Sequence, residues 1–176
     1  ICPTGISQYV NNGCTTTLSD FTGSGAVTEN CPSPVTVTQS PIVGTLISVT
    51  PAETITLTVS DSAGNTSTCQ FLLPVIDTIS PIVACPLNQQ EPASAACQGT
   101  LGDYTSLATP SDNCSTPANI TVTQSPAPGT LFSGVQVVTL TAEDESSNTG
   151  MCSFNVTVVD QLDPVIFCPS NQTVGG

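Results

Sequence analysis

Apolar and polar residues alternate with a period of two along six segments of the chain. β-Branched residues are frequent there, as in ETITLTVSD and VQVVTLTAED. This pattern is typical of strands with one face buried and one in water. The predicted strands lie at residues 33–40, 53–61, 69–77, 118–125, 135–144 and 152–160. Clusters of Pro, Gly, Asn and Ser separate them and predict turns.

The chain repeats itself with a step of 83 residues. TVTQSP occurs at residues 36–41 and again at 121–126, so the second repeat has two extra residues before this hexapeptide and loses two after it. Cysteines at positions 2, 14, 31 and 69 recur at 85, 97, 114 and 152, and Cys168 follows Cys85 by the same step. We predict domains at 1–78 and 79–162, with the start of a third repeat at 163–176.

Several short strands in about 83 residues predict an all-β fold of tandem, seven-stranded immunoglobulin-like β-sandwiches with disulfides. The chain has only 5 Phe and 2 Tyr, so each core is thin and cross-links should add stability. Pro81 and Pro164 stand in short linkers, where we expect little hinge freedom. Each added copy would then lengthen a semi-rigid rod. Pro74 predicts that the last strand of the first repeat is unpaired on one side.

Charge excludes several functions. The chain has 13 Asp and Glu and no Lys, Arg or His. Nucleic-acid binding needs cations that neutralise phosphates, so no nucleic acid is expected as a partner. No apolar run approaches the length that spans a bilayer, so we expect no direct membrane insertion. Without His, Ser/His/Asp and Cys/His catalysis are excluded, and we predict that the chain is not an enzyme. Trypsin has no cleavage site.

Nine cysteines without a single His or CxxC pair indicate disulfides in an oxidising compartment. We therefore predict an extracellular, cell-surface location. The chain begins without a positively charged leader, and we expect it to be a piece of something longer.

The motifs SPIVACP, SDNCS, SPAPGTLFSG and VVTLTAEDESSNTGMCSFNVTVVD resemble the hyalin repeat, or HYR domain, over essentially the whole chain. The four-cysteine form is similar to repeats of giant surface adhesins of gliding Bacteroidota, such as SprB, which the type IX secretion system exports. The first repeat departs from the pattern with Glu29 in place of Asp112 and LISVTP in place of LFSG. The resemblance implies an immunoglobulin-like fold and a surface array, but no ligand.

Two disulfide schemes are considered, and other connectivities also remain open. The first and last strands of such a sandwich start at one pole, and HYR domains with two cysteines keep the first and fourth. This favours Cys2–Cys69 and Cys85–Cys152, with Cys14–Cys31 and Cys97–Cys114, and leaves Cys168 for a further repeat. The alternative joins the repeats through Cys14–Cys85 and Cys97–Cys168 and leaves Cys2 unpaired.

Carboxylates stand at predicted turns and linkers, where oxygen ligands at a domain pole suit Ca²⁺. The candidate ligands are Asp61, Asp77, Asp112, Asp144, Asp160 and Asp163. The alternative is that these residues only cap their own turns. Cofactors are otherwise expected to be none.

Short motifs mark glycosylation candidates, so we consider a glycoprotein. Asp-Ser/Thr-hydrophobic sequences place O-linked sites at Ser62 and Thr78. N-linked sequons, relevant to a eukaryotic source, occur at Asn65, Asn113, Asn119, Asn155 and Asn171.

We predict a structural or adhesive repeat segment of a long, disulfide-stapled extracellular filament or adhesin. Its expected partners are neighbouring repeats of the same chain, with surface glycans or other cells as further candidates. One alternative is a spacer module of a secreted multidomain enzyme. Another is a carbohydrate- or protein-binding module, which the scarcity of aromatic residues disfavours.

Overall fold

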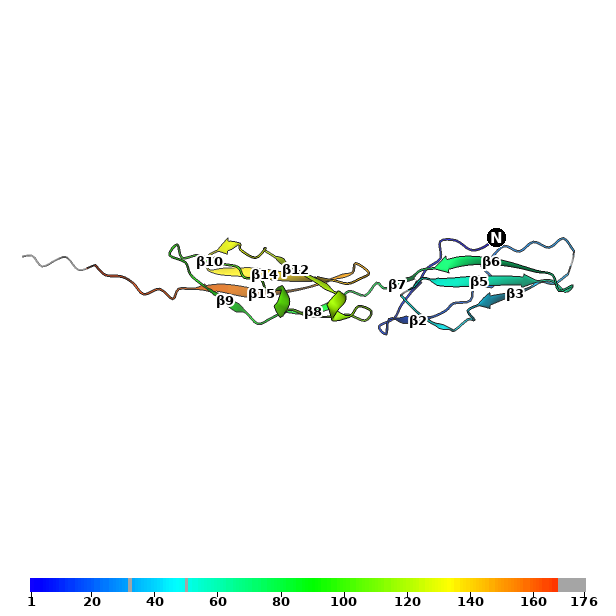
Figure 1. Cartoon of the computed structure of the whole chain (residues 1–176), viewed down its shortest axis with the longest axis horizontal. Helices are drawn as coiled ribbons and strands as arrows, with labels where there is room; N and C mark the ends of the chain where they lie inside the picture. The colour runs from blue at the N-terminus through cyan, green and yellow to red at the C-terminus, as the bar shows by residue number, and fades with distance from the viewer. Residues whose placement is uncertain (32, 50, 168–176) are drawn as a thin grey trace, which may run out of the picture. The chain divides into compact units, whose positions relative to one another are not determined.

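The computed structural model describes residues 1–31, 33–49 and 51–167, and these are almost entirely strands and loops (Figure 1). Each of the six segments with alternating residues contains a strand, so the all-β prediction is confirmed. Within the described ranges, helix is limited to two short 3-10 turns, η1 (Thr105–Leu107) and η2 (Pro117–Asn119). None of the helices found there is long and apolar enough to cross a membrane.

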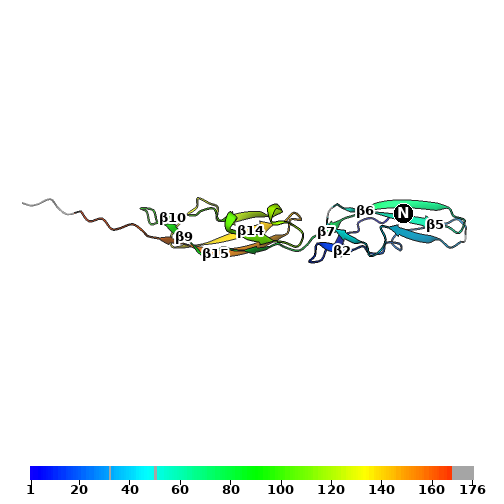
Figure 2. The same ribbon diagram turned by 60° about the horizontal axis from the view of Figure 1, so that its bottom comes forward.

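The first repeat is built around a three-stranded sheet in the order β3-β5-β6. Its strands are β3 (Thr36–Ser40), β5 (Glu53–Ser60) and β6 (Thr66–Leu73), all antiparallel, and β5 and β6 run side by side in both views (Figures 1 and 2). Two short pairs complete the repeat. These are β1 (Gln8–Tyr9) parallel to β7 (Val75–Ile76), and β2 (Thr15–Thr17) antiparallel to β4 (Leu46–Ser48).

Pro74 ends β6 and separates it from β7. A proline has no N–H to donate, but its carbonyl accepts a hydrogen bond of 3.0 Å from the N–H of Gln8. The strand therefore changes partner at this proline, from β5 to β1.

The second repeat has a four-stranded sheet in the order β12-β14-β15-β9. Its strands are β12 (Thr121–Ser125), β14 (Val135–Glu143), β15 (Thr149–Val159) and β9 (Gln89–Pro92). Smaller pairs join β10 (Gly99–Thr100) to β13 (Leu131–Phe132) and β8 (Ile82–Ala84) to β11 (Thr109–Ser111). Val158 pairs with Glu91 as Val75 pairs with Gln8, which preserves the step of 83 residues.

Each repeat has its own hydrophobic core, because its apolar alternate residues turn inward. The first core includes Leu18, Phe21, Ile55, Leu57 and Leu73, and Phe21 meets Phe71 edge to face with ring centroids 5.5 Å apart. The second includes Leu101, Tyr104, Val138, Leu140 and Val156. Tyr104 meets Phe154 in the same geometry at 5.3 Å. Each aromatic pair adds about 1 kcal/mol beyond area burial.

The repeated hexapeptide is explained by its glutamine. Gln39 is only 8% exposed, and its Oε1 accepts the N–H of Phe21 at 2.8 Å while its Nε2 donates to the carbonyl of Ser19. Gln124 does the same for Tyr104 and Gly102. In both repeats this side chain therefore ties the loop that carries the core aromatic residue to an edge strand.

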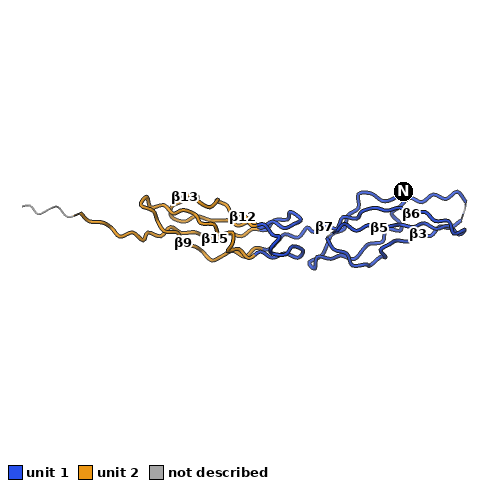
Figure 3. The backbone as a smooth tube through the Cα atoms, in the orientation of Figure 1, with its two compact units in different colours: residues 1–82, 110–121, 142–150 blue, residues 83–109, 122–141, 151–176 orange. Residues whose placement is uncertain are grey.

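Contacts between residues define two compact units that do not follow the 83-residue repeats (Figure 3). Unit 1 comprises residues 1–82, 110–121 and 142–150, and unit 2 comprises 83–109, 122–141 and 151–176. The domains predicted from the sequence, 1–78, 79–162 and 163–176, therefore remain a prediction. Two loops of the second repeat belong to unit 1, and they carry the residues described next.

Candidate metal centre

The structure contains three disulfides among the described residues, and two of them close equivalent loops. Cys2 is bonded to Cys69 and Cys85 to Cys152, each across 67 residues of sequence. These are the two pairs that the resemblance to HYR domains implies. Each bond lies within one repeat.

The third disulfide differs from both sequence schemes. Cys14 is bonded to Cys114, across 100 residues, with the Cα atoms 4.8 Å apart. The prediction of Cys14–Cys31 and Cys97–Cys114 was therefore wrong, and so was the alternative that paired Cys14 with Cys85. Cys31 and Cys97 are exposed and have no partner among the described residues. Cys168, expected to pair with a further repeat, lies outside the described residues.

The expected pairs fail because their cysteines lie at opposite ends of the repeat. The turn before Cys14 lies beside the end of β7, where Val10 donates its N–H to the carbonyl of Ile76. The loop before Cys31 instead lines a pocket with Val59 and Ser67, where β5 ends and β6 begins. In the second repeat, Ala93 lies against Val159 at the end of β15. The loop that carries Cys114 meets Glu145, before β15 begins.

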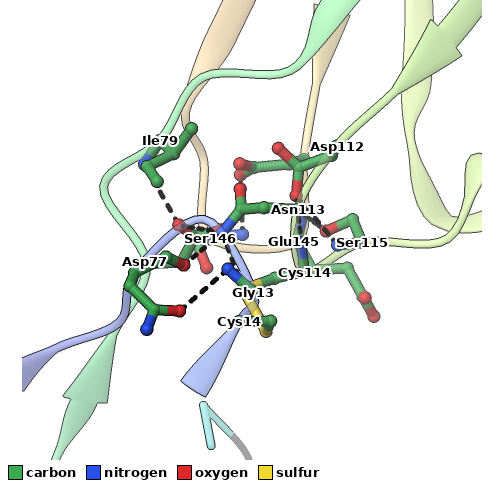
Figure 4. Close-up of a disulfide and its surroundings, with 12 residues drawn as sticks. Gly13, Cys14, Asp77, Ile79, Asp112, Asn113, Cys114, Ser115, Glu145 and Ser146 are labelled. Carbon is green, nitrogen blue, oxygen red and sulfur yellow. Dashed lines mark hydrogen bonds between the residues drawn. A yellow bond between two sulfur atoms is a disulfide. The ribbon is translucent and has the colours of Figure 1, made fainter. Parts of the chain in front are cut away.

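Three carboxylates meet within unit 1. Figure 4 shows two of them, Asp77 and Asp112, beside the Cys14–Cys114 disulfide. Asp77 follows β7, Asp112 follows β11 and Asp144 follows β14. One oxygen from each lies within 4.8 Å of the others. Asn113 joins the group, because its Nδ2 donates to Asp77 Oδ1 at 3.2 Å. We refer to these four residues as the carboxylate cluster.

Each carboxylate is oriented by backbone N–H groups. Asp77 Oδ1 accepts the N–H of Ile79, and Asp112 Oδ2 accepts those of Cys114 and Ser115 at 2.8 and 2.9 Å. Asp144 Oδ1 accepts the N–H groups of Ser146 and Asn148, both at 2.8 Å. The turns and linkers that begin at these residues therefore aim the carboxylates inward.

The carboxylate cluster is buried and has unpaired oxygens. Asp77 is 2% exposed and Asp144 is 5% exposed. Asp77 Oδ2, Asp112 Oδ1 and Asn113 Oδ1 are buried without a hydrogen-bond donor. Two like charges at this separation repel by on the order of 3–4 kcal/mol at an effective dielectric constant of about 20. The chain has no Lys, Arg or His to offset that repulsion.

The other candidate calcium ligands are not part of the cluster. Among the described residues, Asp61, Asp160 and Asp163 belong to no group of three acidic residues with the spacing of a metal site. Asp61 is the counterpart of Asp144 in the first repeat, and it binds only its own turn through Ala63 and Asn65. Hydrogen bonds from Asn65 lower the pKa of Asp61 below the usual range. The contacts of Asp61 are therefore those of an aspartate that caps its own turn.

The glycosylation sites remain predictions, and the structure shows how accessible each is. Ser62, Thr78, Asn65, Asn119 and Asn155 are exposed. Asn113 is half-buried, and its amide donates to Asn11 and to Asp77. A glycan at Asn113 would replace one of the two hydrogens on this amide nitrogen, so at least one of these bonds would be lost. Asn171 lies outside the described residues.

All three carboxylates of the cluster are among the six candidate ligands predicted from the sequence, but the sequence did not distinguish them from the other three. Asn113 was noted as a sequon rather than as a ligand. The contact with Asp77 had no local signal, because it depends on how the loop of residues 112–115 packs beside the turn of residues 11–14.

Residues 76–158 match the family model of the HYR domain. The match supports an HYR domain in this part of the chain and does not distinguish the four-cysteine adhesin form. No curated protein matches the chain. The HYR match and the disulfides fit an extracellular, secreted or surface-attached repeat module of the adhesion type.

Solved structures with similar folds include cadherin and immunoglobulin domains. Protocadherin gammaB7 EC3-6 is 14% identical with a TM-score of 0.36, and the match covers 82% of this chain and 49% of that one. Drosophila N-cadherin EC1-4 is 12% identical with a TM-score of 0.35, covering 73% and 42%. Sidekick-1 immunoglobulin domains 1-4 are 11% identical with a TM-score of 0.28, and the match covers 88% of this chain and 49% of that one. The chain thus spans about half of these structures, and TM-scores this low carry no information on function.

Proposed function

We propose that this chain is a structural and adhesive segment of a long extracellular filament or adhesin, in which successive repeats are joined by disulfides. The observation that carries the proposal is the Cys14–Cys114 bond, which links a residue of the first 83-residue repeat to one of the second. A spacer or binding module needs no covalent bond between its repeats. A segment that transmits tension gains from one.

The unpaired cysteines support continuation of the same linkage. Cys97 is the counterpart of Cys14, and both have left-handed backbones, with φ of 56° and 57°. The preceding turns are also alike, since Cys14 donates its N–H to Asn11 and Cys97 donates to Ser94. Cys97 is therefore held in the conformation that Cys14 uses to form its disulfide. It suits a thiol from a following repeat.

Cys31 is the counterpart of Cys114, and its surroundings repeat as well. Glu29 Oε1 accepts the N–H of Cys31 at 3.0 Å, as Asp112 Oδ2 accepts that of Cys114 at 2.8 Å. Cys31 therefore suits a preceding repeat. A repeat with one such cysteine at each side can be extended head to tail without limit, which is the geometry of a filament.

The disulfides within each repeat favour a mechanical role for a second reason. Cys2–Cys69 and Cys85–Cys152 each close a long loop, so the residues inside cannot extend when the chain is pulled. A repeat that unfolds under load then lengthens little. Lack of Lys and Arg also removes every trypsin site, which suits an exposed thread.

Immunogold electron microscopy of the producing cells tests the proposal. Antibody raised against residues 1–162 should label thin threads on the cell at regular intervals. Label confined to the medium and copurifying with a hydrolase would contradict the proposal and favour the spacer of a secreted enzyme. Diffuse label that a surface glycan competes away would favour a binding module instead.

A further inference from the structure

We propose that the carboxylate cluster of Asp77, Asp112, Asn113 and Asp144 binds one Ca²⁺ ion. The inference does not depend on the filament proposal, because it concerns a site formed within unit 1 by residues that the structure brings together. It reduces six candidate ligands from the sequence to three aspartates and adds an asparagine.

The spacing of the oxygens suits a single shared cation. Calcium ligands lie 2.3–2.6 Å from the ion, so two oxygens on one ion are at most about 5 Å apart. One oxygen from each of the three aspartates lies within 4.8 Å of the others. Every pair of these oxygens therefore falls within the range that one ion can bridge.

Unpaired buried oxygens point to a missing partner. Only 2% of Asp77 is exposed, yet its Oδ2 accepts no hydrogen bond. Asp112 Oδ1 and Asn113 Oδ1 are buried and unpaired too. Buried polar atoms in folded proteins nearly always have a partner. Because the chain contains no Lys, Arg or His, a cation from solution is the partner that would also neutralise the charge.

The ligand chemistry selects calcium among common metals. The set consists of oxygens alone, from three carboxylates and one amide, which excludes the nitrogen and sulfur ligands that Zn²⁺ prefers. Four side chains from separate loops leave room for water or carbonyl oxygen, as the six to eight ligands of Ca²⁺ require. Mg²⁺ demands stricter octahedral geometry and gives up its water reluctantly. Asp112 and Asn113 also line a surface pocket, which gives an ion a route from solvent.

The site adjoins the Cys14–Cys114 disulfide, and the two should be coupled. Asn113 precedes Cys114 in sequence, and its Nδ2 lies 3.1 Å from the Cys114 sulfur. The disulfide holds the loop of Asp112 and Asn113 beside Asp77. Calcium bound to the same loop should in turn slow reduction of the disulfide, because a thiol reaches the sulfur atoms when the loop opens locally and the bound ion opposes that opening.

The test is thermal unfolding and isothermal titration of the oxidised chain with CaCl₂, with MgCl₂ at equal ionic strength for comparison. We expect a Kd of about 10⁻⁴–10⁻³ M for Ca²⁺. A tenfold excess over Kd should raise Tm by about 3–6 °C. Mg²⁺ should give less than half of that shift. No calcium-dependent heat and no shift at 10 mM CaCl₂, about ten times the weakest expected Kd, would overturn the proposal.

Asp77→Asn separates binding from folding, and Asp160→Asn is its matched control. Asn keeps the oxygen that accepts from Ile79 and Asn113, and Asp160 makes the equivalent bond to Leu162 in an exposed position. With EGTA, Asp77→Asn should melt at or above the wild-type temperature, because it removes a repelling charge. With calcium it should melt below wild type, and its Kd should weaken at least about tenfold. Asp160→Asn should follow wild type in both.

Two outcomes of the variant experiment would contradict the site. If Asp77→Asn melts below wild type by the same margin with EGTA and with calcium, the aspartate is only a structural cap. Equal calcium affinity in Asp77→Asn and wild type would place any bound ion elsewhere. A second readout is the rate at which dithiothreitol opens Cys14–Cys114, which calcium should slow in wild type but not in Asp77→Asn.

Discussion

Cys14 is bonded to Cys114, a residue of the next 83-residue repeat, and their Cα atoms lie 4.8 Å apart. The equivalent residues Cys97 and Cys31 donate their backbone N–H groups as Cys14 and Cys114 do, but they are unpaired among the described residues. The disulfide between the two repeats is therefore formed, while the cysteines equivalent to its two members are exposed. The predictions below follow from this arrangement and from the contacts inside each repeat.

The disulfides within each repeat should limit how far the chain extends under force. With both bonds intact, the shortest covalent path from Cys2 to Cys152 runs only through the roughly 16 residues from Cys69 to Cys85, about 50–60 Å when stretched. After reduction the path includes about 150 residues, or about 500 Å. Single-molecule pulling with and without dithiothreitol measures the difference. Equal lengths under both conditions would refute the prediction.

Gln39→Ala should destabilise the first repeat by about 1–3 kcal/mol, because it leaves the buried N–H of Phe21 unpaired. Urea denaturation gives the loss. Gln70→Ala is the control, since Gln70 is exposed and bonds only to Thr56, and it should change stability by less than about 0.5 kcal/mol. A similar loss in the two variants would show that the link between the edge strand and the loop is not what holds Phe21.

Alkaline pH should weaken the second repeat through Tyr104. Burial and the 2.6 Å hydrogen bond to Glu91 raise the pKa of Tyr104 to about 12 from 10.0. Because the folded state holds the proton more tightly, this contribution of about 2–3 kcal/mol is complete below pH 10 and is lost as pH rises to 12. Tyrosinate absorbance in a Tyr9→Phe background measures the pKa.

The control variant is Tyr104→Phe, which has no phenol to ionise at this position. Its free energy of unfolding, measured by urea denaturation at several pH values, should lack the loss between pH 10 and 12 that ionisation of Tyr104 causes in wild type. Ionisation of Tyr104 near pH 10 in the folded protein would contradict the prediction.

Ser147→Gly should stabilise the chain by about 0.5–1 kcal/mol. Ser147 has a φ of 66°, and its counterpart in the first repeat is Gly64, with a φ of 88°. A side chain at such a φ is strained, and glycine removes the strain at some cost in unfolded-state entropy. Thermal unfolding gives the gain, and Gly64→Ser should give the reverse. A loss of stability in Ser147→Gly would mean that the serine side chain has a role that its contacts do not show.

The strands could be predicted because their signal is local. Alternation in residues 53–61 and 135–144 reflects the two faces of β5 and β14, and nothing distant changes it. The pairs Cys2–Cys69 and Cys85–Cys152 also follow from where strands begin in a sandwich. Pairing of Cys14 depends instead on which end of the repeat each loop occupies, and spacing in sequence does not encode that.

The sequence predicted only part of the candidate site, because the local signal of an aspartate at a turn does not show which aspartates come together. Asp77, Asp112 and Asp144 each begin a turn or linker. Asp61 does too, but among the described residues it belongs to no group of three acidic residues with the spacing of a metal site. Turn chemistry alone cannot separate them, because all four accept backbone N–H groups. Burial of Asp77 and its unpaired oxygen arise only when the loop of residues 112–115 packs against the first repeat.

Disulfide mapping by mass spectrometry tests the central claim, that successive repeats are joined by Cys14–Cys114, most directly. The unreduced chain is digested with proteases that cleave at Asp and Glu, because trypsin has no site. Cys2 and Cys14 then share one peptide, since the first acidic residue is Asp20, and this peptide should be linked both to the peptide of Cys69 and to that of Cys114. Alkylation before digestion should mark Cys31 and Cys97. Linked peptides joining Cys14 to Cys31 and Cys97 to Cys114 would contradict the account, because each repeat would then be closed on itself.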